Sequence, residues 1–151
     1  MEAVYTGWFR EFTFPDLEAA CHSVWGGAML TTASHVPFFA TANGRTIGAS
    51  YSINIMIESL TDTTVRVLGK PSREAFEAAL AGMALPADAA PNVVVVGDDP
   101  GLEIAMARSV GAFGICITTG LMKRNAVAGL PLEQQPELLI DDLNTLRRAL
   151  A

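Results

Sequence analysis

The chain has 151 residues, of which 50% are hydrophobic and 17% are charged, and these proportions exclude intrinsic disorder. Sixteen acidic residues against ten basic ones give a net charge of −6, which argues against a nucleic-acid or anionic-membrane surface because both require basic residues. The length favours one domain rather than two independent ones.

No apolar run is long enough to span a bilayer, and the first residues lack the basic-then-apolar pattern of a signal peptide. The two cysteines, Cys21 and Cys116, have neither metal-binding nor redox spacing and are typical of core thiols in a reducing compartment. We therefore expect a soluble, cytoplasmic, globular protein without a nucleic-acid or membrane partner.

The first part of the chain predicts short strands and helices in alternation. Thr13, followed three residues later by Asp16, is typical of a capped helix start. The expected elements are a strand at 3–8, a helix that starts after Thr13 and stops at Gly26, a strand at 28–32, a loop at 37–45, and a helix with the apolar face Ile53, Met56, Ile57 and Leu60.

The rest of the chain predicts a parallel sheet covered by helices, because strands and helices alternate with short connections. The β-branched run at 92–96 is typical of a strand buried on both faces. The expected elements are a strand at 65–68, a turn at 69–72, a helix with the stripe Phe76, Ala79, Leu80 and Met83, the strand at 92–96, a helix to about residue 110, a strand at 113–118, and a last strand at 137–140 with a helix at 142–150.

Charged residues follow two of these predicted strands: Lys70 follows one, and Asp98 and Asp99 follow the next. Ligands of open parallel sheets bind at the carboxyl ends of the strands, so neighbouring strands would bring these side chains together. Mg²⁺ takes one or two carboxylates together with phosphate oxygens, and a lysine can hold an anion as a point charge. Glu103 lies one helical turn after Asp99 and could face the same edge.

Each of these residues also has a purely structural interpretation. Asp99 before Pro100 fits a helix N-cap, and Glu103 fits an acid favoured by the helix dipole. Lys70 could be a solvated lysine in a turn. Asp98 is the hardest to explain structurally, because a carboxylate at the end of an apolar run is costly to bury without a cation or hydrogen-bond donors.

Three segments in this part of the chain, taken together, resemble the last two motifs of the haloacid-dehalogenase-like (HAD) phosphatase superfamily. They are GKPS at 69–72, VGDDPGLEIAMA at 96–107 and TTG at 118–120. The segment FTFPDLEAACHSVWGGAMLTTASH at 12–35 resembles the end of the large α/β cap of the nitrophenylphosphatase-like subclass. The resemblance implies an α/β fold with a partial Rossmann-like parallel sheet and flanking helices. It implies the tail of the cap at 1–62, with a soft boundary between 42 and 64, and the C-terminal half of the core at 63–151.

The resemblance also implies roles for individual residues. Lys70 matches the lysine that orients the nucleophile and the transferring phosphoryl group, and Asp98 matches the acid that binds Mg²⁺. Asp99 joins Asp98 as a predicted metal-site residue. Glu103 stands where the subclass has an aspartate, which favours a water-mediated role at the metal.

Ser34 and His35 fall in a cap loop that faces the substrate in relatives. An ordinary surface-loop histidine is an equal alternative for His35. Because the relatives carry other residues in this loop, the identity of the substrate is left open.

The nucleophile and the general acid of this family belong to an Asp-x-Asp motif, and the sequence contains no such motif. We expect the C-terminal part of a longer Mg²⁺-dependent phosphatase that hydrolyses a small phosphorylated metabolite through an aspartyl-phosphate, with this chain alone inactive. An exposed strand edge would then favour self-association or pairing with the missing N-terminal part. The alternative is a non-catalytic, truncated relative that acts as a binding or interaction module.

Overall fold

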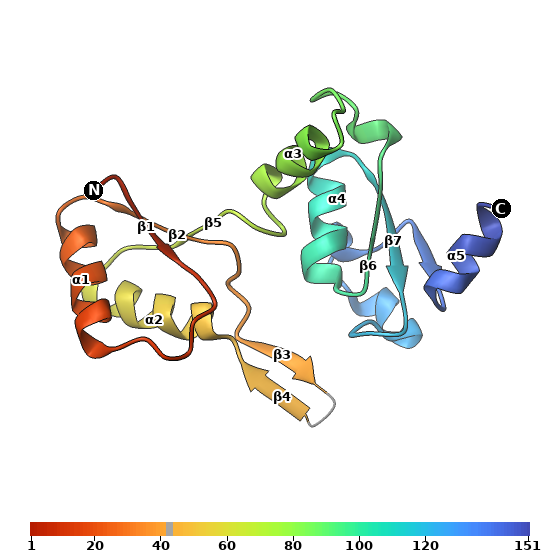
Figure 1. Cartoon of the computed structure of the whole chain (residues 1–151). Helices are drawn as coiled ribbons and strands as arrows, with labels where there is room; N and C mark the ends of the chain where they lie inside the picture. Colours follow the sequence, from red (N-terminus) through yellow and green to blue (C-terminus); the bar gives the residue numbers. More distant parts are fainter. Residues whose placement is uncertain (42–43) are drawn as a thin grey trace. The chain divides into compact units, whose positions relative to one another are not determined.

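The computed structural model describes residues 1–41 and 44–151, and it divides into two compact units, Met1–Gly69 and Lys70–Ala151 (Figure 1). Each unit has its own parallel sheet and its own buried side chains, in one cluster in the first unit and two in the second, whereas length alone favours a single domain. The predicted α/β class, with parallel strands flanked by helices, is confirmed. Among the described residues, no helix is long and apolar enough to cross a membrane.

The N-terminal unit is a parallel sheet with two helices on one face (Figure 1). The sheet order is β1-β2-β5, and the buried cluster between the helices and the sheet includes Leu17, Leu30 and Ile57. The elements in chain order are β1 (Ala3–Thr6), α1 (Phe14–Trp25), β2 (Met29–Thr32), β3 (Phe38–Thr41), β4 (Gly44–Ile47), α2 (Ala49–Thr61) and β5 (Arg66–Val67).

Helix α1 begins as the sequence predicts. The Thr13 hydroxyl accepts a hydrogen bond from the backbone N–H of Asp16, and the Asp16 carboxylate accepts one from the backbone N–H of Thr13 at 2.8 Å. This backbone hydrogen bond, followed by the one from the Thr13 hydroxyl, lowers the pKa of Asp16. The expected capping box is therefore confirmed.

The predicted loop at 37–45 is wrong, because most of it forms the antiparallel hairpin β3–β4; residues 42 and 43 lie outside the described residues. The Arg45 guanidinium lies over the Phe38 ring at 4.3 Å, and the Trp8 ring meets Phe39 edge-on at 5.1 Å. Both strands are only four residues long, and large apolar side chains such as Phe38 and Ile47 are exposed, so the sequence lacks the buried apolar run that would distinguish it from a loop.

The strand predicted at 65–68 forms, but in the other sheet. β5 pairs in parallel with β2 of the N-terminal unit, with Thr32 opposite Val67. The expectation that residues from about 63 onward form one sheet is therefore wrong for this strand. A two-residue strand carries no pattern that identifies its partner, so the partner depends on contacts distant in the sequence.

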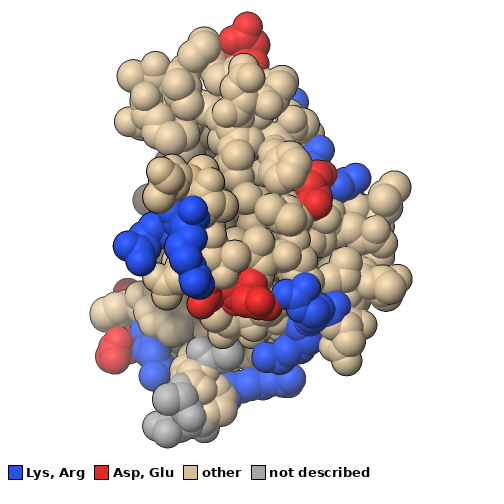
Figure 2. Space-filling view, turned by 90° about the vertical axis from the view of Figure 1, so that its right-hand side faces the viewer, with Lys and Arg blue, Asp and Glu red and all other residues tan. Residues whose placement is uncertain are grey.

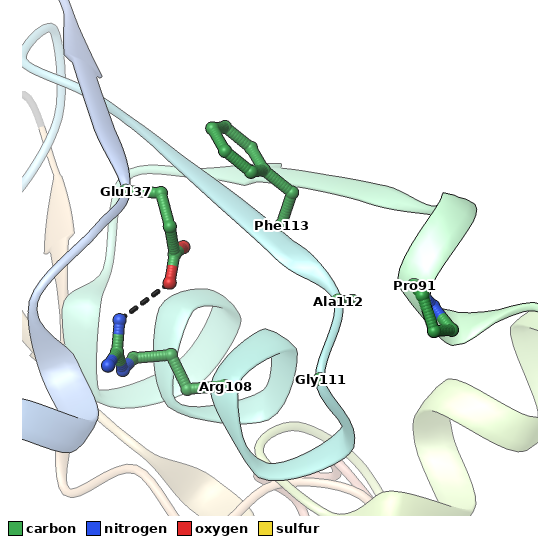
Figure 3. Close-up of a pocket in the computed structure, with 6 residues that line it drawn as sticks. All are labelled: Pro91, Arg108, Gly111, Ala112, Phe113 and Glu137. Atoms are coloured by element: carbon green, nitrogen blue, oxygen red, sulfur yellow. Dashed lines mark hydrogen bonds and ion pairs between the residues drawn. The ribbon is translucent and has the colours of Figure 1, made fainter.

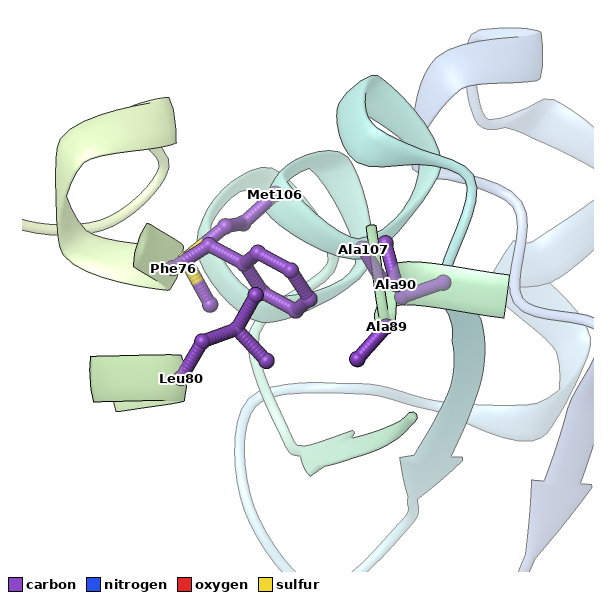
Figure 4. Close-up of a cluster of buried hydrophobic side chains, with 7 residues drawn as sticks. Phe76, Leu80, Ala89, Ala90, Met106 and Ala107 are labelled. Atoms are coloured by element: carbon purple, nitrogen blue, oxygen red, sulfur yellow. The ribbon is translucent and has the colours of Figure 1, made fainter. Parts of the chain in front are cut away.

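The C-terminal unit is a three-stranded parallel sheet in the order β6-β7-β8. In Figure 4, Phe76 and Leu80 of α3 face Met106 and Ala107 of α4, and these four side chains belong to one buried cluster. The elements are α3 (Arg73–Gly82), the 3₁₀ turn η1 (Ala90–Asn92), β6 (Val94–Gly97), the π-helical turn η2 (Pro100–Ile104), α4 (Ala105–Val110), β7 (Phe113–Ile117), the 3₁₀ turns η3 (Arg124–Gly129) and η4 (Leu132–Gln134), β8 (Leu138–Ile140) and α5 (Leu143–Ala149).

The strand that the sequence predicts to be buried on both faces lies at the end of this sheet. Among the described residues, β6 pairs only with β7, and Val94 is 51% exposed. The central strand is β7, where Ile115 and Cys116 are both buried. A β-branched run indicates a strand but not the number of its neighbours, and the neighbours determine its burial.

The amino end of this sheet is held by a charged contact between α4 and the residue before β8. Figure 3 shows Arg108 and Glu137 pointing toward one another across a surface pocket. Arg108 Nη1 lies 2.6 Å from Glu137 Oε1 and also donates to the carbonyl of Gln135 at 3.1 Å. The other Glu137 oxygen accepts from the Gly114 N–H at 2.7 Å, so one carboxylate connects α4, β7 and β8.

The surface carries few charges, in keeping with the composition. On the face in Figure 2, much of the visible surface is neither acidic nor basic.

We expect Glu137→Ala to destabilise the C-terminal unit by roughly 1–3 kcal/mol, because it leaves the Gly114 N–H and the Arg108 charge without their acceptor. Both tryptophans and both tyrosines precede residue 70, so their fluorescence would not report on the unfolding of this unit. The free energy of unfolding is therefore measured by hydrogen exchange of the β7 amides. The control is Glu77→Ala, which removes the exposed pair with Arg73 and should cost less than about 0.5 kcal/mol. Equal effects of the two substitutions on stability would contradict this stabilising role of Glu137.

Candidate active site

Asp98 directly follows the last residue of β6, at the carboxyl end of the sheet. Its Oδ2 accepts a hydrogen bond from the backbone N–H of Leu121 at 3.1 Å, and its backbone carbonyl accepts one from Met122 at 3.1 Å. A Cβ atom at Gly120 would overlap the Asp98 carboxylate. No hydrogen bond from the described residues reaches Oδ1 of Asp98, so the loop after β7 fixes this carboxylate and leaves one of its oxygens available.

Asp99 is the N-cap of the π-helical turn η2. Its Oδ1 accepts a hydrogen bond from the Gly101 N–H at 2.9 Å, and Pro100 occupies the first position of the turn. Burial raises the pKa of Asp99; the hydrogen bond from Gly101 opposes this rise, and the charges of Glu103 and Asp98 add to it. The cap interpretation of Asp99 is thus confirmed.

Glu103 joins the turn to Lys70. Its Oε1 forms an ion pair with the Lys70 ammonium, and its Oε2 accepts a hydrogen bond from the Asp99 N–H at 3.2 Å. The Glu103 side chain is 12% exposed and that of Lys70 is 49% exposed. A Cβ atom at Gly97 would overlap the Glu103 side chain, so the glycine at the end of β6 provides the space for it.

The element that brings Lys70 to this carboxylate differs from the one that the sequence predicts. Lys70 does not follow a strand beside β6: it precedes α3, whose N-cap Ser72 accepts a hydrogen bond from the Ala75 N–H at 3.2 Å. The Lys70–Pro71 peptide bond is cis. Because α3 packs against α4, the turn before α3 brings the ammonium to the acids at the end of β6.

The three acids create a negative potential that extends into the sheet. Cys116 of β7 is fully buried. Burial raises the pKa of its thiol to about 11, and the charges of Asp98, Glu103 and Asp99 contribute to the rise. Cys116 is therefore a neutral core thiol at neutral pH, as expected for a structural cysteine.

The metal assignment of Asp98, Asp99 and Glu103 remains a prediction. Within residues 1–41 and 44–151, no three His, Cys, Asp or Glu side chains form a group that could hold a metal ion. Mg²⁺ nevertheless needs only one or two protein carboxylates when waters and phosphate complete its shell, and the available oxygen of Asp98 meets that requirement.

Ser34 and His35 lie in the N-terminal unit, after β2. The Ser34 carbonyl accepts hydrogen bonds from the hydroxyls of Ser50 at 2.9 Å and Thr32 at 3.2 Å. The His35 ring packs on Tyr51 with centroids 4.6 Å apart, and its Nδ1 atom is buried without a hydrogen-bond partner among the described residues. A substrate contact for these two residues remains a prediction.

The sequence analysis did not identify two glycines that make room for the acidic side chains of the site. Gly97 accommodates Glu103, and Gly120 accommodates Asp98. Both lie within the family-like motifs, so the signal was present, but their role is visible only when the side chain that crosses each of them is placed.

Comparison with known proteins identifies the family. A family model described as HAD-hydrolase-like matches residues 67–146, more than half of the chain, and the chain belongs to that family. The haloacid dehalogenase-like hydrolase domain-containing protein 2 of mouse is 30% identical over 115 residues, which are 76% of this chain and 42% of the mouse protein. The human protein of the same name is 29% identical over 111 residues. The chain thus matches about two fifths of these relatives.

Solved structures confirm the fold. The glycerol phosphate phosphatase of Mycobacterium tuberculosis, solved with magnesium, has a TM-score of 0.84 at 25% identity, covering 96% of this chain and 42% of that chain. The same enzyme has also been solved with calcium. The 4-nitrophenylphosphatase of Thermotoga maritima has a TM-score of 0.84 at 19% identity, covering 98% of this chain and 55% of that chain. The predicted resemblance to the HAD family is thus confirmed, and the resemblance to nitrophenylphosphatases is confirmed in the fold.

We expect Asp99→Asn to stabilise the C-terminal unit at neutral pH, because asparagine also caps helices and the substitution removes a carboxylate whose pKa is raised in the folded state. An acid with a raised folded pKa costs stability when ionised, and this cost disappears as the pH falls through that pKa toward the ordinary value of 3.8. The difference between variant and parent should therefore shrink on acidification, as measured by hydrogen exchange of the β7 amides.

The matched variant Asp99→Ala removes the cap as well as the charge and should cost about 1 kcal/mol relative to Asp99→Asn. An asparagine variant that is less stable than the parent at neutral pH would contradict this account of Asp99.

Proposed function

We propose that this chain is the part of a HAD-like phosphatase that supplies Lys70 and Asp98 to the hydrolysis of a small phosphorylated metabolite. The observation that carries the proposal is the meeting of Lys70 with the acids at the carboxyl end of β6, within the segment that matches the family. The similar solved structures include a glycerol phosphate phosphatase and a 4-nitrophenylphosphatase, and the substrates in these names support this substrate class.

In this proposal Lys70, whose side chain is half exposed, binds the phosphate oxygens through its ammonium, which is held in place at Glu103. Asp98 holds Mg²⁺ through Oδ1, while the Leu121 N–H fixes Oδ2. Bound there, the cation would offset negative charge on the phosphoryl group. The magnesium and calcium in structures of the mycobacterial neighbour support a divalent metal.

The nucleophile has to come from outside these 151 residues, since they contain no Asp-x-Asp motif. β6 is the end strand of the described sheet, and a strand added in parallel beside it would end next to Asp98. An aspartate there would attack phosphorus as the ester P–O bond breaks, and the leaving alkoxide would take up a proton. Water would then hydrolyse the aspartyl-phosphate to inorganic phosphate and restore the carboxylate.

We expect Lys70→Ala and Asp98→Asn each to lower kcat of the complete protein by about 100-fold or more, because each removes charge stabilisation at the reacting phosphoryl group. The measurement is release of the alcohol from a small phosphate monoester such as 4-nitrophenyl phosphate. Arg73→Ala, which changes only an exposed pair with Glu77, is the control and should leave kcat unchanged. Near-full activity of both site variants would overturn the phosphatase assignment.

The absent Asp-x-Asp motif favours one second candidate, a module that binds a phosphorylated ligand without turning it over. Calorimetric titration of this chain with Mg²⁺ and inorganic phosphate tests it. A binding heat that Lys70→Ala abolishes would support the binding module, and the absence of heat at millimolar ligand would leave it without support.

A further inference from the structure

Glu103 differs from Asp98 in how its carboxylate is used. Both Glu103 oxygens are engaged by the protein itself, Oε1 by the Lys70 ammonium and Oε2 by the Asp99 N–H. Among the described residues, Asp98 has only Oδ2 engaged by a hydrogen bond. The two acids of the family-like motif therefore offer different chemistry at the carboxyl end of β6.

The position of Glu103 is built into the backbone. Asp99 caps η2, and Glu103, four residues later, returns a hydrogen bond to the Asp99 N–H. This is the reciprocal arrangement of a capping box, with one additional residue because the turn is π-helical. On its other side the Glu103 side chain lies against Gly97, where a Cβ atom would overlap it. The carboxylate is thus confined between a strand end and a helical turn.

The ion pair also limits what else Glu103 can bind. A divalent cation on Oε1 would lie beside the Lys70 ammonium, and the two positive charges on one oxygen would repel each other. Magnesium also requires near-ideal octahedral geometry, which a carboxylate fixed at both oxygens can adopt only by breaking a contact.

We propose that Glu103 is a positioning residue that holds the Lys70 ammonium at the end of β6, and that it is not a metal ligand. Its significance for catalysis rests on the proposed phosphatase function. Glutamate suits this role because its extra methylene, compared with aspartate, lets one side chain engage both the turn and the lysine. Asp98 remains as the carboxylate of the motif with an oxygen available for a cation.

The chain contains only two lysines, Lys70 and Lys123, which permits a direct test that needs no catalysis. The intact chain is treated with a limiting amount of an amine-acetylating reagent, and the modification of each lysine is measured by mass spectrometry. Lys123 serves as the internal reference. Glu103→Gln is the informative variant, because its amide oxygen can still accept from the Asp99 N–H while the charge that holds Lys70 is gone.

We expect acetylation of Lys70 relative to Lys123 to rise about threefold in Glu103→Gln, the size expected for the loss of a partly exposed ion pair. Asp98→Asn, the matched control, should leave the ratio unchanged. A residue that only closed the turn would not change the ratio when glutamine replaced it, so an unchanged ratio in a folded Glu103→Gln variant overturns the proposal. Far-ultraviolet circular dichroism establishes that the variant is folded.

Gly97→Ala provides an independent route, because the added methyl group displaces Glu103 without changing any charge. It should raise the acetylation ratio of Lys70 to Lys123 as Glu103→Gln does, and an unchanged ratio in the folded variant counts against the proposal.

Addition of millimolar Mg²⁺ tests directly whether Glu103 binds a cation. The ratio in the parent chain should stay constant. A rise in the parent that is absent in Glu103→Gln would mean that Glu103 releases Lys70 to hold the cation, which would overturn the proposal. These outcomes do not depend on phosphatase activity, so they fail separately from the proposed function.

Discussion

The parallel pairing of β6 with β7 determines the geometry of the candidate site. Its register sets Gly97 opposite Cys116, so the segments that follow the two strands leave the sheet side by side. Asp98 departs from one strand, and the Leu121 N–H that holds its carboxylate follows the other. A shift of one residue would turn the side chains to the opposite face of the sheet and separate this pair. The loop after β7 can approach closely only because Gly120 has no side chain there.

Local features of this site could be predicted from sequence because the residues that make them are close together in the chain. The cap at Asp99 depends on Gly101, two residues later, and the cap of α1 depends on Thr13 and Asp16, three residues apart. In such cases residue type and spacing are sufficient, since a helix start needs a short side-chain acceptor near its free N–H groups. The same reasoning identified Asp98 as an acid without a simple structural explanation.

Features that depend on distant partners could not be predicted in the same way. Arg66–Val67 forms a strand, but its pairing with β2 depends on a contact with residues more than thirty positions earlier. The run that ends at Gly97 has the composition of a buried strand, yet burial follows from neighbours that composition does not specify. The sequence predicts Lys70 at this edge because its strand is expected beside β6, and that expectation is wrong; the packing of α3 on α4 brings Lys70 to Glu103.

The charge balance of the site supports the proposal that a cation binds there together with a phosphate ester. Asp98, Asp99 and Glu103 carry three negative charges against the single positive charge of Lys70, which leaves two in excess when all are ionised. That excess contributes to the raised pKa of Asp99 and of the Cys116 thiol. A phosphate monoester adds further negative charge, and in a partly buried site the repulsion is only weakly screened. A divalent cation on the available oxygen of Asp98 would cancel the excess, so Lys70 could then attract the phosphate instead of only neutralising its own surroundings.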